Sequence, residues 1–119
     1  MIELILAFYL NHLCLIKQVL IEAEGEPLEG KTMVAEVIRE RSRRSGLGYC
    51  DVIAQPGQFG SRKVSAPPHA VVEAWTAILQ TPKCRAVHFD VHGSKWSRHL
   101  TVACYAGGHT FYENIKWRG

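Results

Sequence analysis

Apolar residues at helical spacing dominate the first twenty positions of the chain. Polar residues interrupt the stretch MIELILAFYLNHLCLIKQVL, which has neither the basic start nor the small-residue cleavage site of an export signal. We therefore expect a helix buried in the protein rather than a membrane span, ending near Gly25. The apolar positions that carry this prediction are Ile5, Leu6, Tyr9, Leu13, Ile16 and Leu20.

Two further helices are predicted after this one. Pro27 suits the first turn of a helix, Val34, Val37 and Ile38 form an apolar stripe along it, and Gly46 is placed to end it. The segment PPHAVVEAWTAILQTP has a helical pattern with proline at both ends. Between them, YCDVIAQPGQFGSRKV contains too much glycine and proline for a long element.

The last third of the chain changes to the two-residue period of β-strands. RAVHFDVH alternates, and LTVACYAGGHTFYE reads as two strands around a tight turn at residues 106–108. Because helices come first and strands follow, the fold class is α+β: about three helices followed by a short antiparallel sheet or hairpin. A length of 119 residues, 47% of them hydrophobic, indicates a single domain spanning residues 1–119.

Net charge and cysteine content say little about the binding partners or the redox compartment of the protein. The formal charge of +3 and the pI near 8.8 suit attraction to a polyanion such as a cell wall, although the excess is small. The four cysteines show no CxxC spacing, so they are either buried thiols or two disulfides in one of three pairings. They are Cys14, Cys50, Cys84 and Cys104.

The segment IEAEGEPLEG, residues 21–30, holds four carboxylates among two glycines and a proline. Such a run is often a solvated turn between helices. Glu22, however, falls in the last turn of the first predicted helix, where a side chain can reach the lip of a groove. If that helix continues through Glu26, the two carboxylates are i, i+4 neighbours, and their repulsion favours keeping one of them protonated, as a general acid requires.

Four motifs in order resemble the SleB-type cell wall hydrolases, which include spore cortex-lytic enzymes and phage or proteobacterial relatives. They are EAEGEPLEGKTMVAEVIRERS, YCDVIAQPGQF, AVHFDVHGSKW and GGHTFY, and together they cover about residues 14–113. The resemblance implies a small lysozyme-like catalytic domain. It also implies cleavage of peptidoglycan between N-acetylmuramic acid and N-acetylglucosamine, as a lytic transglycosylase that forms a 1,6-anhydro product without a cofactor.

By motif position, the resemblance makes Glu22 the catalytic acid. A lytic reaction needs no second carboxylate, whereas a hydrolytic muramidase normally uses a pair; Asp51 and Asp90 are the candidates for that partner. Two positions depart from the family pattern: Glu24 replaces an arginine, and Glu40 with Arg41 replaces an Asn-Arg pair. These changes leave the acid role in place but remove any contact that the missing arginine makes.

The same motifs supply the candidate substrate-binding residues. Amides can hydrogen-bond sugar hydroxyl and acetamido groups, and an aromatic ring can pack on a pyranose face. Each of these side chains also has a purely structural alternative, such as a ring that fills the core or a histidine that makes a hydrogen bond. The candidates are Glu26, Gln55, Gln58, Phe59, His88, Asp90, Trp96, His109 and Tyr112.

Two other functions are weighed against this one. His88 and His92, with His109 or Cys104, could supply three zinc ligands, but residues four apart on a strand lie too far apart for one ion, and we expect no metal. The arginines of RERSRRSG could meet phosphates, yet no aromatic platform lies beside them, so we expect no nucleic-acid partner. A wall-binding module without catalysis is the better non-enzymatic alternative.

Localisation follows from the implied function. We expect a protein made in the cytoplasm without a recognisable cleavable signal that acts on the cell wall, in the manner of a phage endolysin after lysis begins. We further expect a monomer that binds peptidoglycan glycan strands and is not stably inserted in a membrane. The apolar start leaves a signal-anchor route open.

Overall fold

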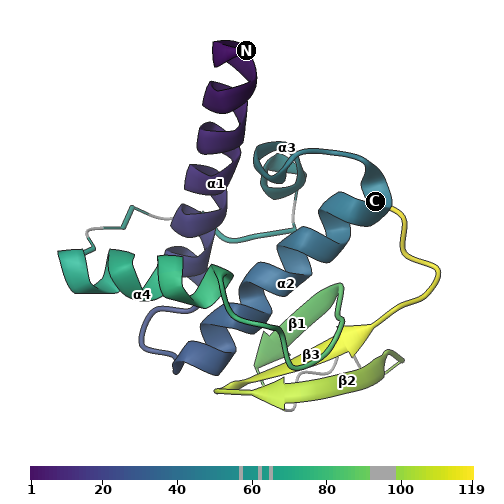
Figure 1. Ribbon diagram of the computed structural model, residues 1–119. Coiled ribbons are helices and arrows are strands. Elements are labelled where there is room, and N and C mark those ends of the chain that lie inside the picture. Colours follow the sequence, from purple (N-terminus) through teal and green to yellow (C-terminus); the bar gives the residue numbers. More distant parts are fainter. Residues whose placement is uncertain (57, 62, 65, 92–98) are drawn as a thin grey trace.

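The computed structural model describes residues 1–56, 58–61, 63–64, 66–91 and 99–119 (Figure 1). In this part of the chain, helices precede strands, so the predicted α+β class is confirmed. The short helix α3 was not expected as an element of its own. The elements are α1 (Ile2–Glu22), α2 (Leu28–Ser45), α3 (Tyr49–Ala54), α4 (Pro68–Ile78), β1 (His88–Val91), β2 (Thr101–Ala106) and β3 (His109–Glu113).

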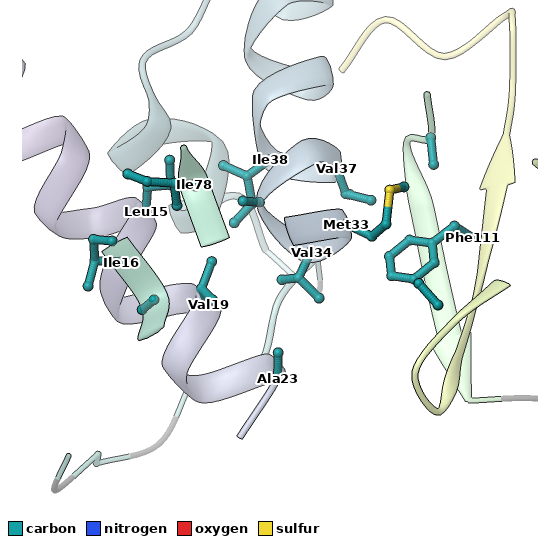
Figure 2. Packing of buried hydrophobic residues seen from close by; sticks show 14 of the residues in the cluster. Leu15, Ile16, Val19, Ala23, Met33, Val34, Val37, Ile38, Ile78 and Phe111 are labelled. Carbon is teal, nitrogen blue, oxygen red and sulfur yellow. The ribbon is translucent and has the colours of Figure 1, made fainter. Parts of the chain in front are cut away.

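Helix α2 lies at the centre of the molecule, with helices on one side and the sheet on the other (Figure 1). It ends as predicted, because Gly46 adopts a left-handed conformation with φ of 75° and its N–H bonds the carbonyl of Ser42. On the sheet side of α2, Met33 and Val37 face Phe111, a residue of β3 (Figure 2). All three side chains are fully buried. The opposite side of α2 meets α1 and α4 through buried residues that include Leu15, Val19, Ile38 and Ile78.

The three strands form an antiparallel sheet in the order β1-β3-β2. The predicted tight turn joins β2 to β3, where Gly107 has a φ of 58°, a conformation that favours glycine. In the pairing of β1 with β3, His88 stands opposite Tyr112 and Phe89 opposite Phe111. The alternation of side chains along each strand then decides which candidate site residues share a face.

The expectation that the first helix is buried is wrong for its first half. Only the part of α1 from Leu15 onward contributes buried residues, whereas Leu4 is 73% exposed and Phe8 is 66% exposed. Figure 1 shows this half projecting beyond the rest of the molecule. A helix of 21 residues is about 30 Å long, and the neighbouring elements of this small protein surround only its C-terminal part.

Two disulfides select one of the three possible pairings. Cys14 of α1 is joined to Cys50 of α3, and Cys84 is joined to Cys104 of β2. The first bridge fastens α1 to α3 at the point where α1 leaves the body of the molecule. The second ties the loop after α4 to the sheet.

Candidate active site

Glu22 is the last residue of α1 and is half-buried. Its Oε1 accepts two hydrogen bonds: one from Nε2 of Gln18, at 2.9 Å, and one from the backbone N–H of Gly60, at 2.6 Å. Gln18 is almost completely buried, and its Nε2 also donates to the carbonyl of Gly60, at 2.8 Å. Gln18 therefore fixes both the carboxyl group and the loop that binds it.

Both donors reach the same oxygen of Glu22, so the carboxyl group has two unequal oxygens. Among the described residues, these two donors reach Oε1 and neither is directed at Oε2, so the two oxygens have different surroundings. Gly60 can approach this closely because it has no side chain: a Cβ there would lie 3.1 Å from Oε1 of Glu22. The geometry suits a group that transfers a proton from a fixed position.

Glu26 does not extend the helix, so the predicted i, i+4 repulsion with Glu22 does not arise. The helix ends at Glu22, and Glu26 lies in the loop before α2. Its carboxylate accepts the N–H of Gly108, at 2.9 Å to Oε1, and Oε1 lies 2.8 Å from Nδ1 of His109. The contact between Glu26 and His109 is short enough for an ion pair, but its atoms are not aligned for a hydrogen bond. Glu26 thus holds the β2–β3 turn against the loop that follows Glu22.

Arg41 of α2 organises a second cluster, although its side chain is buried. Its Nε donates to the carbonyl of Val87, at 2.6 Å, and its Nη1 donates to Oε1 of Gln58, at 2.9 Å. Its Nη2 lies 3.2 Å from Nδ1 of His88, and its guanidinium stands 4.8 Å from the ring centre of Phe59. Arg41 therefore holds Gln58 and Phe59, the two residues directly before Gly60, whose N–H binds Glu22.

This cluster changes the acid–base properties of two groups. Burial lowers the pKa of Arg41 to about 10. Burial, followed by the nearby charge of Arg41, lowers the pKa of His88 to about 4. His88 is consequently neutral at pH 7, and its Nδ1 can accept a hydrogen bond from Arg41.

The sheet divides the remaining candidates between two faces. Tyr112 donates its hydroxyl hydrogen to Oδ1 of Asp90, at 2.9 Å, on the face that also carries His88. His109 lies on the opposite face with Phe89 and Phe111, and the ring centres of His109 and Phe89 are 5.4 Å apart. Tyr112 and His109 are three residues apart on β3, so their side chains lie on opposite faces of the sheet.

The model of a family described as Cell Wall Hydrolase matches residues 25–112, most of the chain. The chain belongs to the cell wall hydrolase family. None of the curated proteins compared with it matches significantly.

Two solved structures share the fold of this cell wall hydrolase. One is the catalytic domain of the germination-specific lytic transglycosylase SleB from Bacillus anthracis, with 23% identity and a TM-score of 0.70 over 87% of this chain and 93% of that chain. The other is the catalytic domain of the Bacillus cereus SleB protein, with 24% identity and a TM-score of 0.67 over 87% and 90%. The expected SleB-type family and its fold are confirmed.

The other candidates in this cell wall hydrolase take varied positions. Gln55 caps the C-terminus of α3, and the exposed Asp51 lies on the same helix. Trp96 lies outside the described residues, as does His92 of the zinc alternative. Cys104 is bonded to Cys84 and so offers no thiolate for a metal. Over the described part of the chain, no group of three metal-ligating side chains is assembled.

Two arginines of the arginine-rich segment of α2 form ion pairs with carboxylates of the same chain. Arg43 pairs with both Glu36 and Glu40. Arg44 binds Glu40 at 3.3 Å and Glu113 of β3 at 2.6 Å. These arginines join α2 to itself and to the sheet, which argues against a surface for phosphates.

Sequence reasoning missed three residues of the site. Gln18 stands four positions before Glu22, which places both on one helix face, so its contact could have been predicted. Arg41 continues the buried stripe of Val34, Val37 and Ile38, and that spacing marks it as a buried cation. For Gly60, no local signal shows that its N–H points at Glu22.

Proposed function

We propose that this cell wall hydrolase cleaves peptidoglycan glycan strands between N-acetylmuramic acid and N-acetylglucosamine, as a lytic transglycosylase with Glu22 as its general acid. Membership of the family supports action on the wall. One of the solved structures with this fold is itself named a lytic transglycosylase. The observation that carries the proposal is the orientation of the Glu22 carboxyl group by Gln18 and Gly60.

In the proposed reaction, Oε2 of protonated Glu22 donates its proton to the glycosidic oxygen. The bond from C1 of the muramoyl residue to that oxygen then breaks and leaves an oxocarbenium-like centre. The 6-hydroxyl of the same sugar forms a bond to C1, and its proton passes to the Glu22 carboxylate, which restores the starting state. The product carries a 1,6-anhydro ring, and no water is consumed.

The residues around Glu22 fit the binding of a polar sugar chain. Gln58 and Phe59 directly precede Gly60, which binds Glu22, and we assign them to substrate binding together with Gln55. His109, which contacts Glu26, would support the β2–β3 turn. His88, Asp90, Trp96 and Tyr112 complete the proposed substrate-binding set.

The two disulfides support action outside the cytoplasm. Disulfides persist in oxidising compartments and are rare in the cytosol. Every cysteine of the chain is paired, Cys14 with Cys50 and Cys84 with Cys104. An enzyme that meets the cell wall from the periplasm or cell envelope fits this chemistry.

The test is to digest purified peptidoglycan with the wild type and Glu22→Gln and to analyse the released muropeptides by mass spectrometry. We expect 1,6-anhydro products from the wild type and none from the variant. Glu24→Gln is the matched control, because it removes an exposed carboxylate two positions away, and it should release the same products as the wild type.

Other outcomes discriminate between the alternatives. Reducing ends in place of anhydro ends would identify a hydrolytic muramidase that uses a second carboxylate. Equal release by Glu22→Gln and the wild type would refute catalysis by Glu22. Binding of peptidoglycan by both proteins, with no release by either, would favour a wall-binding module.

A further inference from the structure

The outer half of α1 exposes large apolar side chains on successive turns. Residues 4–6 are Leu, Ile and Leu, and residues 8–10 are Phe, Tyr and Leu; each is between 53% and 73% exposed. Ile2 and Leu13 extend the same surface in both directions. By length and composition, α1 is apolar enough to enter a membrane, although its C-terminal part is packed in the core.

The distribution of these side chains around the helix indicates which kind of partner could bury them. Successive residues of a helix point about 100° apart, so each run of three consecutive apolar residues covers most of the circumference. A groove on a protein, or one helix of a second copy, would cover a single stripe. A helix that is apolar nearly all round is typical of a lipid environment.

Charge along this surface agrees with lipid. Before His12 the only charged side chain is that of Glu3. The net charge of +3 adds a weak attraction to anionic headgroups.

We propose that residues 2–10 of α1 insert into one leaflet of a lipid bilayer and hold the protein at the membrane surface. Nine residues are about 14 Å long, roughly half of a hydrocarbon core of about 30 Å, so this part enters the bilayer without crossing it. This replaces the expectation that the protein stays out of membranes. The inference does not depend on the reaction proposed for Glu22.

The body of the molecule sets where the insertion stops. Asn11 and His12 are half-buried against α3, where Oδ1 of Asn11 accepts the N–H of Cys50 at 3.5 Å and the ring of His12 meets that of Tyr49. The disulfide from Cys14 to Cys50 fastens α1 at the same level. From there to Glu22 the helix runs about 12 Å, so the membrane would hold the active site at a short, fixed height.

The first experiment is flotation with preformed vesicles of phosphatidylethanolamine and phosphatidylglycerol. We expect the wild type to float and Leu6→Gln/Phe8→Gln/Leu10→Gln to float at least about tenfold less. The matched control is Val72→Gln/Leu79→Gln/Ile115→Gln, which removes equally exposed apolar side chains elsewhere and should float like the wild type. Release of soluble muropeptides should be equal for all three proteins, so a loss of flotation is not a loss of folding or activity.

The second experiment measures depth with bromine-labelled lipids, which quench tryptophan fluorescence at short range. Added fluorescence from Phe8→Trp should be quenched, whereas that from Tyr105→Trp, on the exposed side of β2, should not. Failure of the wild type to float, or equal flotation of the helix variant, would overturn the proposal. So would a lipid-free dimer that the helix substitutions dissociate, or removal of residues 2–10 from the protein isolated from cell envelopes.

Discussion

The backbone nitrogen of Gly60 lies 2.6 Å from Oε1 of Glu22, although the two residues are 38 positions apart in the sequence. This hydrogen bond joins the end of α1 to the residue that directly follows the QPGQF motif, far away in the sequence. The loop is fixed from its other side by Arg41, which holds Gln58 and Phe59. The position of the proposed general acid therefore depends on a chain of contacts that begins in the middle of α2.

Replacing Gly60 by alanine tests whether this close approach matters. The new Cβ would lie 3.1 Å from Oε1 of Glu22, so the carboxyl group must shift by a few tenths of an ångström. We expect kcat to fall by roughly tenfold with little change in KM, because misplacement of a reacting group costs rate. The measurement is steady-state release of muropeptides, with Ser61→Ala, an exposed neighbour, as control. Unchanged kcat would mean that Glu22 does not need the Gly60 contact.

Arg41→Lys tests the contacts by which Arg41 holds the loop before Gly60. Lysine keeps the charge but cannot reach Val87, Gln58 and His88 together, nor stack on Phe59 in the same way. We expect the free energy of unfolding to fall by roughly 2–4 kcal/mol, since a buried hydrogen-bond network is broken. Urea denaturation measures it, and Arg39→Lys on the same helix should change it by less than about 0.5 kcal/mol. A similar small change for Arg41→Lys would show that the network contributes little.

The comparison of sequence with structure shows where local patterns are sufficient. The apolar stripe of α2 and its glycine stop predicted that helix well, because both signals act within a few residues. The same spacing failed for α1, since periodicity shows that a helix forms and does not show whether enough protein exists to cover it. Glu22 was found through a motif, whereas its partner Gly60 belongs to a contact that only tertiary folding creates.

His88 should make stability depend on pH between about 4 and 6.5. Burial and the charge of Arg41 lower the pKa of His88 to about 4, whereas the unfolded chain has a value near 6.5. In this interval the unfolded state binds a proton that the folded state does not, so stability falls as pH decreases and changes no further below about 4. We expect a loss of roughly 1–3 kcal/mol, reduced from the full shift because the group is only half-buried.

Urea denaturation of wild type and His88→Gln across this pH interval isolates that contribution. Burial raises the pKa of Glu36, and its opposite effect remains in both proteins, so the difference between the two curves reports His88. A constant difference across the interval would show that His88 has a similar pKa in the folded and unfolded states.

The disulfide from Cys14 to Cys50 should stabilise the fold and preserve the junction of α1 with α3. It closes a loop of 36 residues, and loops of this size are associated with roughly 3–4 kcal/mol when the bridge restricts the unfolded chain. We expect Cys14→Ser/Cys50→Ser to lose about that amount in urea denaturation, measured without reductant. Reductant should then destabilise the double variant further through Cys84 and Cys104. A double variant as stable as the wild type would assign the bridge no role in stability.

Asp90 offers the sharpest distinction between the lytic and hydrolytic mechanisms. Its carboxylate accepts the hydroxyl of Tyr112 at 2.9 Å, so Asp90→Asn and Tyr112→Phe alter the same hydrogen bond from opposite sides. In a lytic reaction neither side chain moves a proton, and we expect both variants to keep the anhydro product with a loss in kcat of no more than about tenfold. In a hydrolytic reaction with Asp90 as the second carboxylate, Asp90→Asn would lose at least about a hundredfold, while Tyr112→Phe would lose far less. A similar loss of kcat in the two variants would give Asp90 a structural role. A much larger loss in Asp90→Asn would give it a role in proton transfer.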